Sequence, residues 1–311
     1  MQAVVVSTYG GPEVLTVGEV EMPEPGPGQV RLKVTAAGIN PVDIWNRNDG
    51  SWAGLTTPCI LGYDVSGRVD AVGRGVSADL EGQAVMAMTR FPAGGGGYAE
   101  FVIVDEELLA PLDPGVDLVA AASIPLAAGT AVEVLARLKE SSGKVLVLGA
   151  SGGVGMFFLQ LAAAAGISTI AVGRERNHSL MRDFGAAGCV DYRSPDAMAQ
   201  AAELAGGSFD AIADLVGGPL LTTAQPFLRD DGTIVAIATP VLDIDRFIDA
   251  NQSFHGVLIR DNGDRLRRLA DLFSEGKLRT HVTHVLPLSE VAAAHRLVET
   301  GEAGGKVVLT P

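Results

Sequence analysis

The chain has 311 residues, of which 47% are hydrophobic and 19% charged, and it contains no unbroken apolar run long enough to span a membrane. This composition excludes disordered and fibrous proteins and, at roughly 100–200 residues per domain, predicts two globular domains. With 37 acidic residues against 23 Lys and Arg, the formal net charge is −14, so the whole-protein field repels nucleic acids and anionic membranes. We therefore expect neither as a partner.

The cysteines and the N-terminus restrict the class further. Cys59 and Cys189 lie far apart and form no CxxC pair, which argues against a disulfide scaffold or a cysteine-rich zinc lobe. The N-terminal segment lacks the basic flank and cleavage site of a signal peptide, so we expect a cytoplasmic location.

From Met1 to about Leu112 the sequence predicts a β-rich, largely antiparallel module. Short β-branched runs are separated there by Gly and Pro, and they span Ala3–Val6, Gln29–Ala36, Val65–Val72, Ala84–Met88 and Tyr98–Val104. From Lys144 onward, apolar runs of strand length alternate with helical segments. These runs are Val145–Leu148, Thr169–Val172, Cys189–Asp191, Asp210–Leu215, Thr233–Ile237 and Phe254–Leu258.

Six such runs with helices between them predict an α/β fold, a doubly wound parallel sheet of the Rossmann type. The helix expected after them, Asp264–Ser274, has its apolar residues at helical spacing. On this pattern we expect Arg265, Arg267 and Arg268 on the solvated face of that helix.

The most informative segment is the first of these strands and the glycines that follow it. Small residues at Ala150, Gly152 and Gly155 fit the G-x-G-x-x-G spacing with Ala in the first place. They serve a tight turn, a close approach of the backbone to pyrophosphate, and close packing of helix on strand. The helix N-terminus then binds phosphates through its free amides. The predicted loop comprises Ala150, Ser151, Gly152, Gly153, Val154 and Gly155.

The same residues also fit G-x-S-x-G, the nucleophile elbow of α/β-hydrolases, with Ser151 as nucleophile. Chain order permits a triad, because an acid and then a histidine follow this serine. The candidates are Asp214 or Asp231 and His255, His284 or His295. Against a hydrolase stand the missing HGGG-type oxyanion segment, the glycines that continue to Gly155, and the five further strand-like runs.

The end of the second strand of the sheet predicts which dinucleotide is bound. An NAD site carries Asp or Glu there, whereas this chain has Gly173 followed by Arg174. A small residue leaves room for a 2′-phosphate, and an arginine supplies a bidentate donor for it, so NADPH is favoured over NADH. Alternatively, Arg174 and Arg176 face solvent and Glu175 binds the ribose. Tyr192, after the third strand, is positioned to flank the adenosine.

The whole chain resembles the medium-chain dehydrogenase/reductase superfamily, and within it the zinc-independent quinone oxidoreductase branch. The stretches that carry the resemblance are the glycine loop and Ala37-Gly38-Ile39-Asn40-Pro41-Val42-Asp43, Pro58–Gly62, Asp64–Gly67, Val72-Gly73, Gly97-Tyr98-Ala99-Glu100, Ala128-Gly129-Thr130-Ala131 and Gly305-Lys306-Val307-Val308-Leu309. The resemblance implies a GroES-like catalytic domain at 1–121 and 279–311 and a Rossmann domain at 122–278. It places the substrate where the two domains meet.

Departures from the zinc-dependent alcohol dehydrogenases concern the metal. Asn40 stands where those enzymes have a cysteine, and Gly62-Tyr63-Asp64 stands where they have a Gly-His-Glu ligand segment. A catalytic zinc needs three N, S or O ligands, so we expect no metal. Without a Lewis acid, the expected acceptors are quinones and α,β-unsaturated carbonyls, which delocalise the charge of an arriving hydride.

The resemblance also implies roles for individual residues. Asn40 would donate to the substrate oxygen or the nicotinamide ribose, and Thr130 would bond the nicotinamide or its ribose. Tyr63 is either a proton donor or an aromatic of the pocket wall, and Asp43 is a helix cap rather than a general base. Trp45 and Trp52 suggest an apolar lining for a planar ring. The remaining residues expected near the cofactor follow the fourth, fifth and sixth strands: Val216, Ile237, Ala238, Thr239, Val257 and Ile259.

The resulting hypothesis is an NADPH-dependent oxidoreductase that transfers a hydride to a quinone or enone. We expect it to form a homodimer through the strand near 254–259, as is common in this superfamily. Two alternatives stay open, a serine hydrolase that uses Ser151 and a non-enzymatic NADPH-binding sensor.

Overall fold

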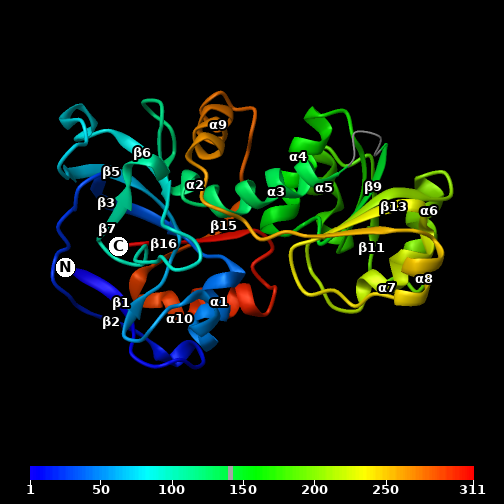
Figure 1. The fold of residues 1–311 in the computed structure, drawn as a ribbon, viewed down its shortest axis with the longest axis horizontal. Coiled ribbons are helices and arrows are strands. Elements are labelled where there is room, and N and C mark those ends of the chain that lie inside the picture. Colours follow the sequence, from blue (N-terminus) through cyan, green and yellow to red (C-terminus); the bar gives the residue numbers. More distant parts are fainter. Residues whose placement is uncertain (139–142) are drawn as a thin grey trace. The chain divides into compact units, whose positions relative to one another are not determined.

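The computed structural model describes residues 1–138 and 143–311, and the chain divides into two compact units (Figure 1). Unit 1 comprises Met1–Gly129 and Arg260–Pro311, and unit 2 comprises Thr130–Ile259. The boundaries that the family resemblance implies, at 121 and 279, differ from these. Helix α9, Gly263–Ser274, packs beside strand β8 and therefore belongs to unit 1, which accounts for the difference at the second boundary. In the described residues, no helix has the length and apolarity needed to cross a membrane.

Unit 1 is the β-rich module that the sequence predicts. A small antiparallel sheet has the order β2-β1-β4, and a seven-stranded sheet has the order β15-β16-β3-β5-β6-β8 with β7 paired to β3. The strands are β1 Gln2–Val6, β2 Leu15–Glu19, β3 Gln29–Gly38, β4 Cys59–Ile60, β5 Asp64–Val72, β6 Ala84–Met88, β7 Phe101–Asp105, β8 Leu109–Pro111, β15 Val282–Pro287 and β16 Lys306–Thr310. Between Met1 and Leu112, the strands β2, β4 and β8 are additional to the five runs expected.

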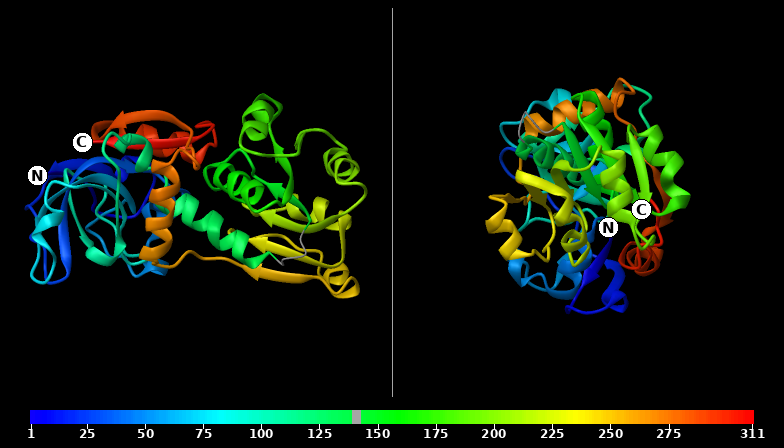
Figure 2. Two further views of the ribbon diagram at one scale, coloured as in Figure 1. Left: turned by 90° about the horizontal axis from the view of Figure 1, so that it is seen from above. Right: turned by 90° about the vertical axis from the view of Figure 1, so that its right-hand side faces the viewer.

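The C-terminal segment returns to this module. Strand β16 pairs antiparallel with β3, with Val308 opposite Gly38 and Leu309 opposite Ala37. Both ends of the chain consequently lie in unit 1, where the red C-terminal elements accompany the blue and cyan strands (Figure 2). The helices of unit 1 are α1 Pro41–Asp49, α2 Leu118–Ala121, α9 and α10 Val291–Glu299. Helix α3, Pro125–Arg137, begins in unit 1 and ends in unit 2.

Unit 2 contains the predicted doubly wound sheet, with all neighbouring strands parallel and the order β11-β10-β9-β12-β13-β14. Its strands are β9 Lys144–Leu148, β10 Ser168–Gly173, β11 Gly188–Asp191, β12 Phe209–Asp214, β13 Leu228–Ala236 and β14 Ser253–Gly256, and its helices are α4 Gly153–Ala164, α5 His178–Asp183, α6 Ala197–Leu204, α7 Leu220–Ala224 and α8 Ile244–Asp249. After the exposed Lys144, the central strand β9 is apolar from Val145 to Leu148, and these four residues are fully buried. Between β9 and β12 the winding reverses, and open α/β sheets bind ligands at the carboxyl end of such a switch point.

The expectation that all three arginines of α9 face solvent is wrong for Arg265. Its side chain is buried at 4% exposure, and its guanidinium donates to the carbonyl of Arg260. Because α9 packs beside β8, the position just before Leu266 is buried as well. A guanidinium can occupy this place because a carbonyl accepts its hydrogen bond.

Candidate active site

The glycine turn has the predicted local geometry. After β9, Gly149 adopts φ +78°, a conformation that favours glycine, and Gly152 is the N-cap of α4. A Cβ on Gly155 would lie 2.6 Å from the carbonyl oxygen of Ala150 and closer still to that of Gly149. Residue 155 therefore allows the close packing of helix on strand that the motif requires. Among the described residues, α4 has no side-chain cap hydrogen bond at its N-cap Gly152, and the first amides of a helix have no acceptor within the helix itself.

The residues predicted to surround the adenosine lie together at the ends of β10 and β11. Gly173 ends β10, and a Cβ there would lie 3.2 Å from Oγ of Ser151, so the glycine turn and this strand end are adjacent. Nε of Arg174 donates to the hydroxyl of Tyr192 over 3.1 Å. Tyr192 is 41% exposed. Unit 2 thus combines a small residue, an arginine and an exposed aromatic beside the glycine turn.

The turns after β12, β13 and β14 form the rest of this carboxyl edge. Val216, 55% exposed, follows β12, and Gly217 adopts φ +79°. The buried carboxylate of Asp214 accepts from the amides of both residues, over 3.1 and 2.9 Å, and so fixes this turn. Sequence reasoning considered Asp214 only as a triad acid and missed this role. An acid that ends a buried strand three residues before a glycine pair was the available signal.

Backbone hydrogen bonds connect the other predicted positions to the same edge. The amide of Ile237 donates to the carbonyl of Asp214 over 3.1 Å, and that of Val257 to Ala236 over 2.8 Å. The carbonyl of Thr239 accepts from the amide of Gly218 over 2.9 Å, and Ile259 is 3% exposed. Thr130 lies within α3 and is 6% exposed.

The triad of the hydrolase alternative is not assembled. The Asp214 carboxylate accepts from backbone amides, and Nδ1 of His284 lies 3.1 Å from Oγ1 of Thr283. Both ring nitrogens of His295 lack a hydrogen-bond partner in the described part of the chain. No described contact joins Ser151 to an imidazole, which a nucleophilic serine requires.

In unit 1, Asn40 belongs to a buried polar cluster with Asp64 and Lys306. Nδ2 of Asn40 donates to Asp64 Oδ2 over 2.9 Å, and Lys306 Nζ donates to Asn40 Oδ1 over 2.6 Å and to the carbonyl of Ile39 over 3.0 Å. The other oxygen of Asp64 accepts from the amide of Leu126 over 2.8 Å. Burial raises the pKa of Asp64 to about 6, although Lys306 and the hydrogen bonds oppose this shift. Burial likewise lowers the pKa of Lys306, while the carboxylates act against that change.

Asp43 has the predicted capping role. It is the third residue of α1, and its Oδ2 accepts from the backbone amide of Asn40 over 2.8 Å. Its Oδ1 accepts from the amide of Gly62 over 3.2 Å. Burial, and to a smaller extent the charge of Asp64, raise the pKa of Asp43 to about 7.

Tyr63 is fully buried, and its hydroxyl is engaged on both sides. It donates to the carbonyl of Pro92 over 2.7 Å and accepts from Nδ2 of Asn46 over 2.6 Å. Burial raises the pKa of this hydroxyl well above its usual value. Its ring packs edge-on against that of Phe91, with 5.1 Å between the ring centroids. The Phe91 ring in turn packs edge-on against Trp52, with 6.4 Å between the ring centroids. Of the two roles expected for Tyr63, this placement favours the aromatic wall.

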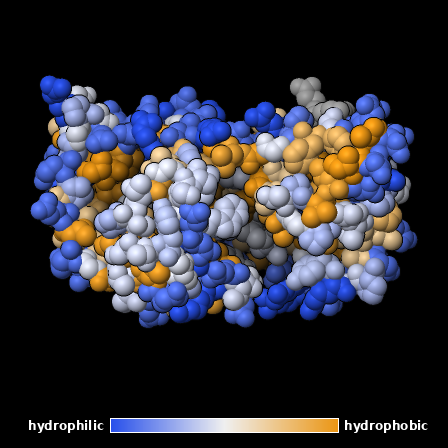
Figure 3. Space-filling view, turned by 60° about the horizontal axis from the view of Figure 1, so that its bottom comes forward, coloured by the Kyte–Doolittle hydropathy of each residue, from blue (hydrophilic) through white to orange (hydrophobic). Residues whose placement is uncertain are grey.

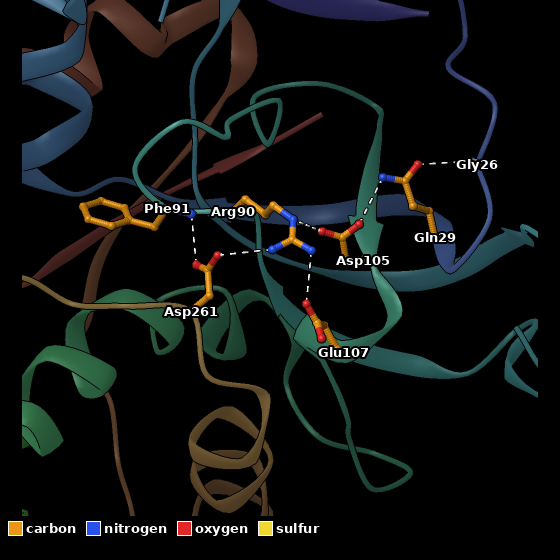
Figure 4. A network of polar contacts seen from close by, with 7 residues as sticks. All are labelled: Gly26, Gln29, Arg90, Phe91, Asp105, Glu107 and Asp261. Carbon is orange, nitrogen blue, oxygen red and sulfur yellow. Dashed lines mark hydrogen bonds and ion pairs between the residues drawn. The ribbon is translucent and has the colours of Figure 1, made fainter. Parts of the chain in front are cut away.

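An ionic network fixes the loop that carries Phe91 (Figure 4). Arg90 pairs with Asp105, with Glu107 over 3.1 Å and with Asp261 over 3.8 Å. The other carboxylate oxygen of Asp261 accepts from the amide of Phe91 over 3.0 Å. The Phe91 backbone is therefore tied to the segment that re-enters unit 1 after Ile259.

Comparison with known proteins agrees with both units. Residues 26–114 match the family described as alcohol dehydrogenase GroES-like domain, and residues 184–309 match the family described as zinc-binding dehydrogenase. A chloroplast envelope quinone oxidoreductase homolog of Arabidopsis thaliana is 31% identical, with 100% of this chain and 98% of the relative covered. An NADPH-dependent alkenal/one oxidoreductase from the same plant is 34% identical, with 100% and 80% covered.

Solved structures agree with this comparison. An NAD-dependent alcohol dehydrogenase superposes with a TM-score of 0.92 at 31% identity, and each chain is covered fully. A mycobacterial protein solved with NADPH superposes with a TM-score of 0.88 at 28% identity, again with full coverage of both chains. Together with relatives that are named oxidoreductases and dehydrogenases, the GroES-like unit and the Rossmann-type sheet identify an oxidoreductase. The chain belongs to the medium-chain dehydrogenase/reductase superfamily, in its quinone oxidoreductase branch.

The donor set around Asn40 does not fit the zinc ion that the family description implies. Oδ1 of Asn40 is engaged by the Lys306 ammonium, and the Tyr63 hydroxyl donates to a carbonyl. A cation in the cluster repels a metal dication, and Asp64 alone cannot supply three ligands. Within residues 1–138 and 143–311, no three His, Cys, Asp or Glu side chains gather in a group that could hold a metal.

Proposed function

We propose that this protein is an NADPH-dependent, zinc-independent reductase that transfers a hydride to a quinone or another α,β-unsaturated carbonyl. The observation that carries this proposal is that the consecutive residues Gly173 and Arg174 lie beside the glycine turn. A glycine at the end of the second strand leaves room for a 2′-phosphate, and the guanidinium supplies its donors. Relatives named as quinone and alkenal/one oxidoreductases support the choice of acceptor.

The cofactor would be held along the carboxyl edge of the unit 2 sheet. The amides at the start of α4 bind its pyrophosphate, and Tyr192 flanks its adenosine. The turns at Val216, at Ile237–Thr239 and at Val257 hold its nicotinamide half, together with Thr130 and Ile259. When bound, NADPH supplies the hydride; the protein orients it and excludes water.

The chemistry of the acceptor follows from the donors that unit 1 offers. Lys306 donates to the amide oxygen of Asn40, and the amide nitrogen of Asn40 donates one of its two hydrogens to Asp64, so its second N–H is the donor that this side chain would offer to a ligand. One or two hydrogen-bond donors suffice for an oxygen whose charge is delocalised through a quinone or enone, whereas a simple ketone needs a stronger Lewis acid. Trp45 and Trp52, 49% and 48% exposed, provide aromatic surface for a planar ring.

We further propose that two copies associate through β14. This strand lies at the end of the order of the six-stranded sheet and leaves a row of backbone groups that a second copy can pair. The chain within and around β14 also carries exposed apolar side chains, namely Val241, Ile244, Ile248, Phe254 and Leu258. Figure 3 shows apolar side chains gathered on the right of the view, over unit 2. The molar mass measured by light scattering tests this dimer.

We also propose a cytoplasmic location, which is tested by imaging the tagged protein in cells.

The reaction is tested by an NADPH-consumption screen. Quinones, alkenals, cyclic enones and enoyl thioesters are offered as acceptors after NADPH binding has been measured. Oxidation of NADPH that depends on one of these classes supports the proposal. Tight NADPH binding without turnover would indicate the sensor instead. Reaction of Ser151 with a serine-directed phosphonate, without NADPH binding, would indicate a hydrolase.

A further inference from the structure

A carboxylate lies next to the place proposed for the 2′-phosphate. Asp191 ends β11 and is the direct register partner of Gly173 at the end of β10. Oδ2 of Asp191 accepts from the backbone amide of Glu175 over 3.1 Å, so the acid also holds the loop that follows Arg174. An unpaired acid in this place would repel a phosphate dianion and favour the unphosphorylated cofactor.

Arg193 pairs with this acid through both carboxylate oxygens. Its Nε lies 3.1 and 3.2 Å from Oδ1 and Oδ2, its Nη2 lies 2.5 Å from Oδ2, and its backbone amide donates to Oδ1 over 2.9 Å. The side chain of Asp191 is 18% exposed and that of Arg193 is 61% exposed, so the arginine covers the acid from the solvent side. The hydrogen bonds from Arg193 hold the pKa of Asp191 well below its usual range, and the acid stays ionised at neutral pH.

We propose that Arg193 is a specificity-determining residue for the phosphorylated cofactor, because it neutralises Asp191, so that the positive charge of Arg174, whose Nε donates to the uncharged Tyr192 hydroxyl, attracts the 2′-phosphate. This inference rests on the proposed use of NADPH and deepens it. Residues 173–176 and 191–193 carry three arginines and two acids. Removal of Arg193 would leave two arginines and two acids in these segments, so their net positive charge would be lost. The charge of Asp191 would then act on the phosphate.

The test is a double-mutant cycle in the full-length protein. Dissociation constants for NADPH and NADH are measured by fluorescence titration for the wild type, Arg193→Gln, Asp191→Asn and the double variant. Repulsion between the unpaired Asp191 carboxylate and the nearby 2′-phosphate should weaken the binding of NADPH to Arg193→Gln about fivefold to tenfold at low salt. The binding of NADH, which has no 2′-phosphate, should weaken by less than about twofold. Asn at position 191 can still accept from Glu175, so the double variant should regain near wild-type NADPH affinity. Added salt should shrink the effect of Arg193→Gln.

The matched control is Arg229→Gln, which breaks a comparable pair at the opposite end of the sheet, where Arg229 Nε lies 2.8 Å from Asp210. It should leave the ratio of the two affinities unchanged. Equal losses for both cofactors in Arg193→Gln would overturn the inference, because they would mean a structural role. A double variant as weak as Arg193→Gln would overturn it too, since Arg193 would then bind the phosphate directly. A wild type that binds neither nucleotide would refute the proposed function itself.

Discussion

Lys306 and Asn40 lie 266 positions apart in the chain, yet the Lys306 ammonium donates to the Asn40 side-chain oxygen over 2.6 Å. This contact fixes the orientation of the Asn40 amide and directs its nitrogen to Asp64. The pairing of β16 with β3 brings the two residues together.

Replacement of Lys306 should therefore destabilise the protein strongly. Lys306→Met removes the cation whose charge acts on the buried carboxylate of Asp64, and a buried charge left uncompensated in this way costs about 3–5 kcal/mol of free energy of unfolding. Urea unfolding at pH 7 measures the loss. Adding Asp64→Asn should recover much of it. The exposed Lys33 on β3 provides the control Lys33→Met, for which we expect a change within about 0.5 kcal/mol. Additive losses in the double variant would contradict the coupling.

The space at Gly155 gives a second prediction. The Cβ in Gly155→Ala would collide with the carbonyls of Gly149 and Ala150, so α4 must shift away from β9. Overpacking of this kind costs about 1–3 kcal/mol, and NADPH should bind more weakly. Gly18→Ala in β2 is the control, because no atom lies within 4 Å of the new Cβ and the strand belongs to unit 1. Thermal unfolding and NADPH titration measure both effects; an unchanged affinity in Gly155→Ala would argue against a phosphate site at this turn.

Arg174 should discriminate between the two nicotinamide cofactors. Arg174→Ala removes a hydrogen bond to a charged phosphate and should weaken NADPH by about 1.5–3 kcal/mol more than NADH. NADH serves as the internal control, since it shares every contact except the 2′-phosphate. Calorimetric titration of both cofactors gives the difference, and equal losses would exclude the role of Arg174 at the 2′-phosphate.

His295 predicts a pH dependence of stability. Burial, with a smaller contribution from Arg47, lowers its pKa from 6.5 to about 3. The folded protein therefore binds fewer protons than the unfolded chain between these values, and the contribution of His295 to stability is present above pH 6.5 and is lost as the pH falls. Between pH 7 and pH 5 the wild type should lose about 2 kcal/mol more than His295→Leu.

At pH 7 the two proteins should have similar stability, because both His295 ring nitrogens lack a hydrogen-bond partner among the described residues. Urea unfolding at the two pH values provides the comparison. Parallel pH profiles for wild type and His295→Leu would show that this histidine does not titrate as argued.

Much of unit 2 could be predicted from the sequence because parallel strands buried on both faces are continuous apolar runs. The glycine turn was equally predictable, since Gly149 and Gly155 meet constraints that few other residues satisfy. The short strands β4 and β8 were missed because two or three residues carry no periodicity.

The least predictable part was the chemistry of unit 1, because it depends on contacts between distant segments. The role of Lys306 arises only when β16 pairs with β3, and the hydroxyl of Tyr63 is engaged only because the loop that carries Pro92 folds over it. Local sequence identifies Asn40 and Tyr63 as unusual residues. It does not reveal which of their atoms are already bonded.

The most direct measurement is NADPH oxidation by a quinone or enone after the protein has been dialysed against a chelator. A metal-free hydride transfer predicts that turnover survives dialysis, that NADPH outperforms NADH, and that added zinc does not increase the rate. Loss of turnover on dialysis with recovery on zinc addition, or indifference of the protein to both nucleotides, would contradict it.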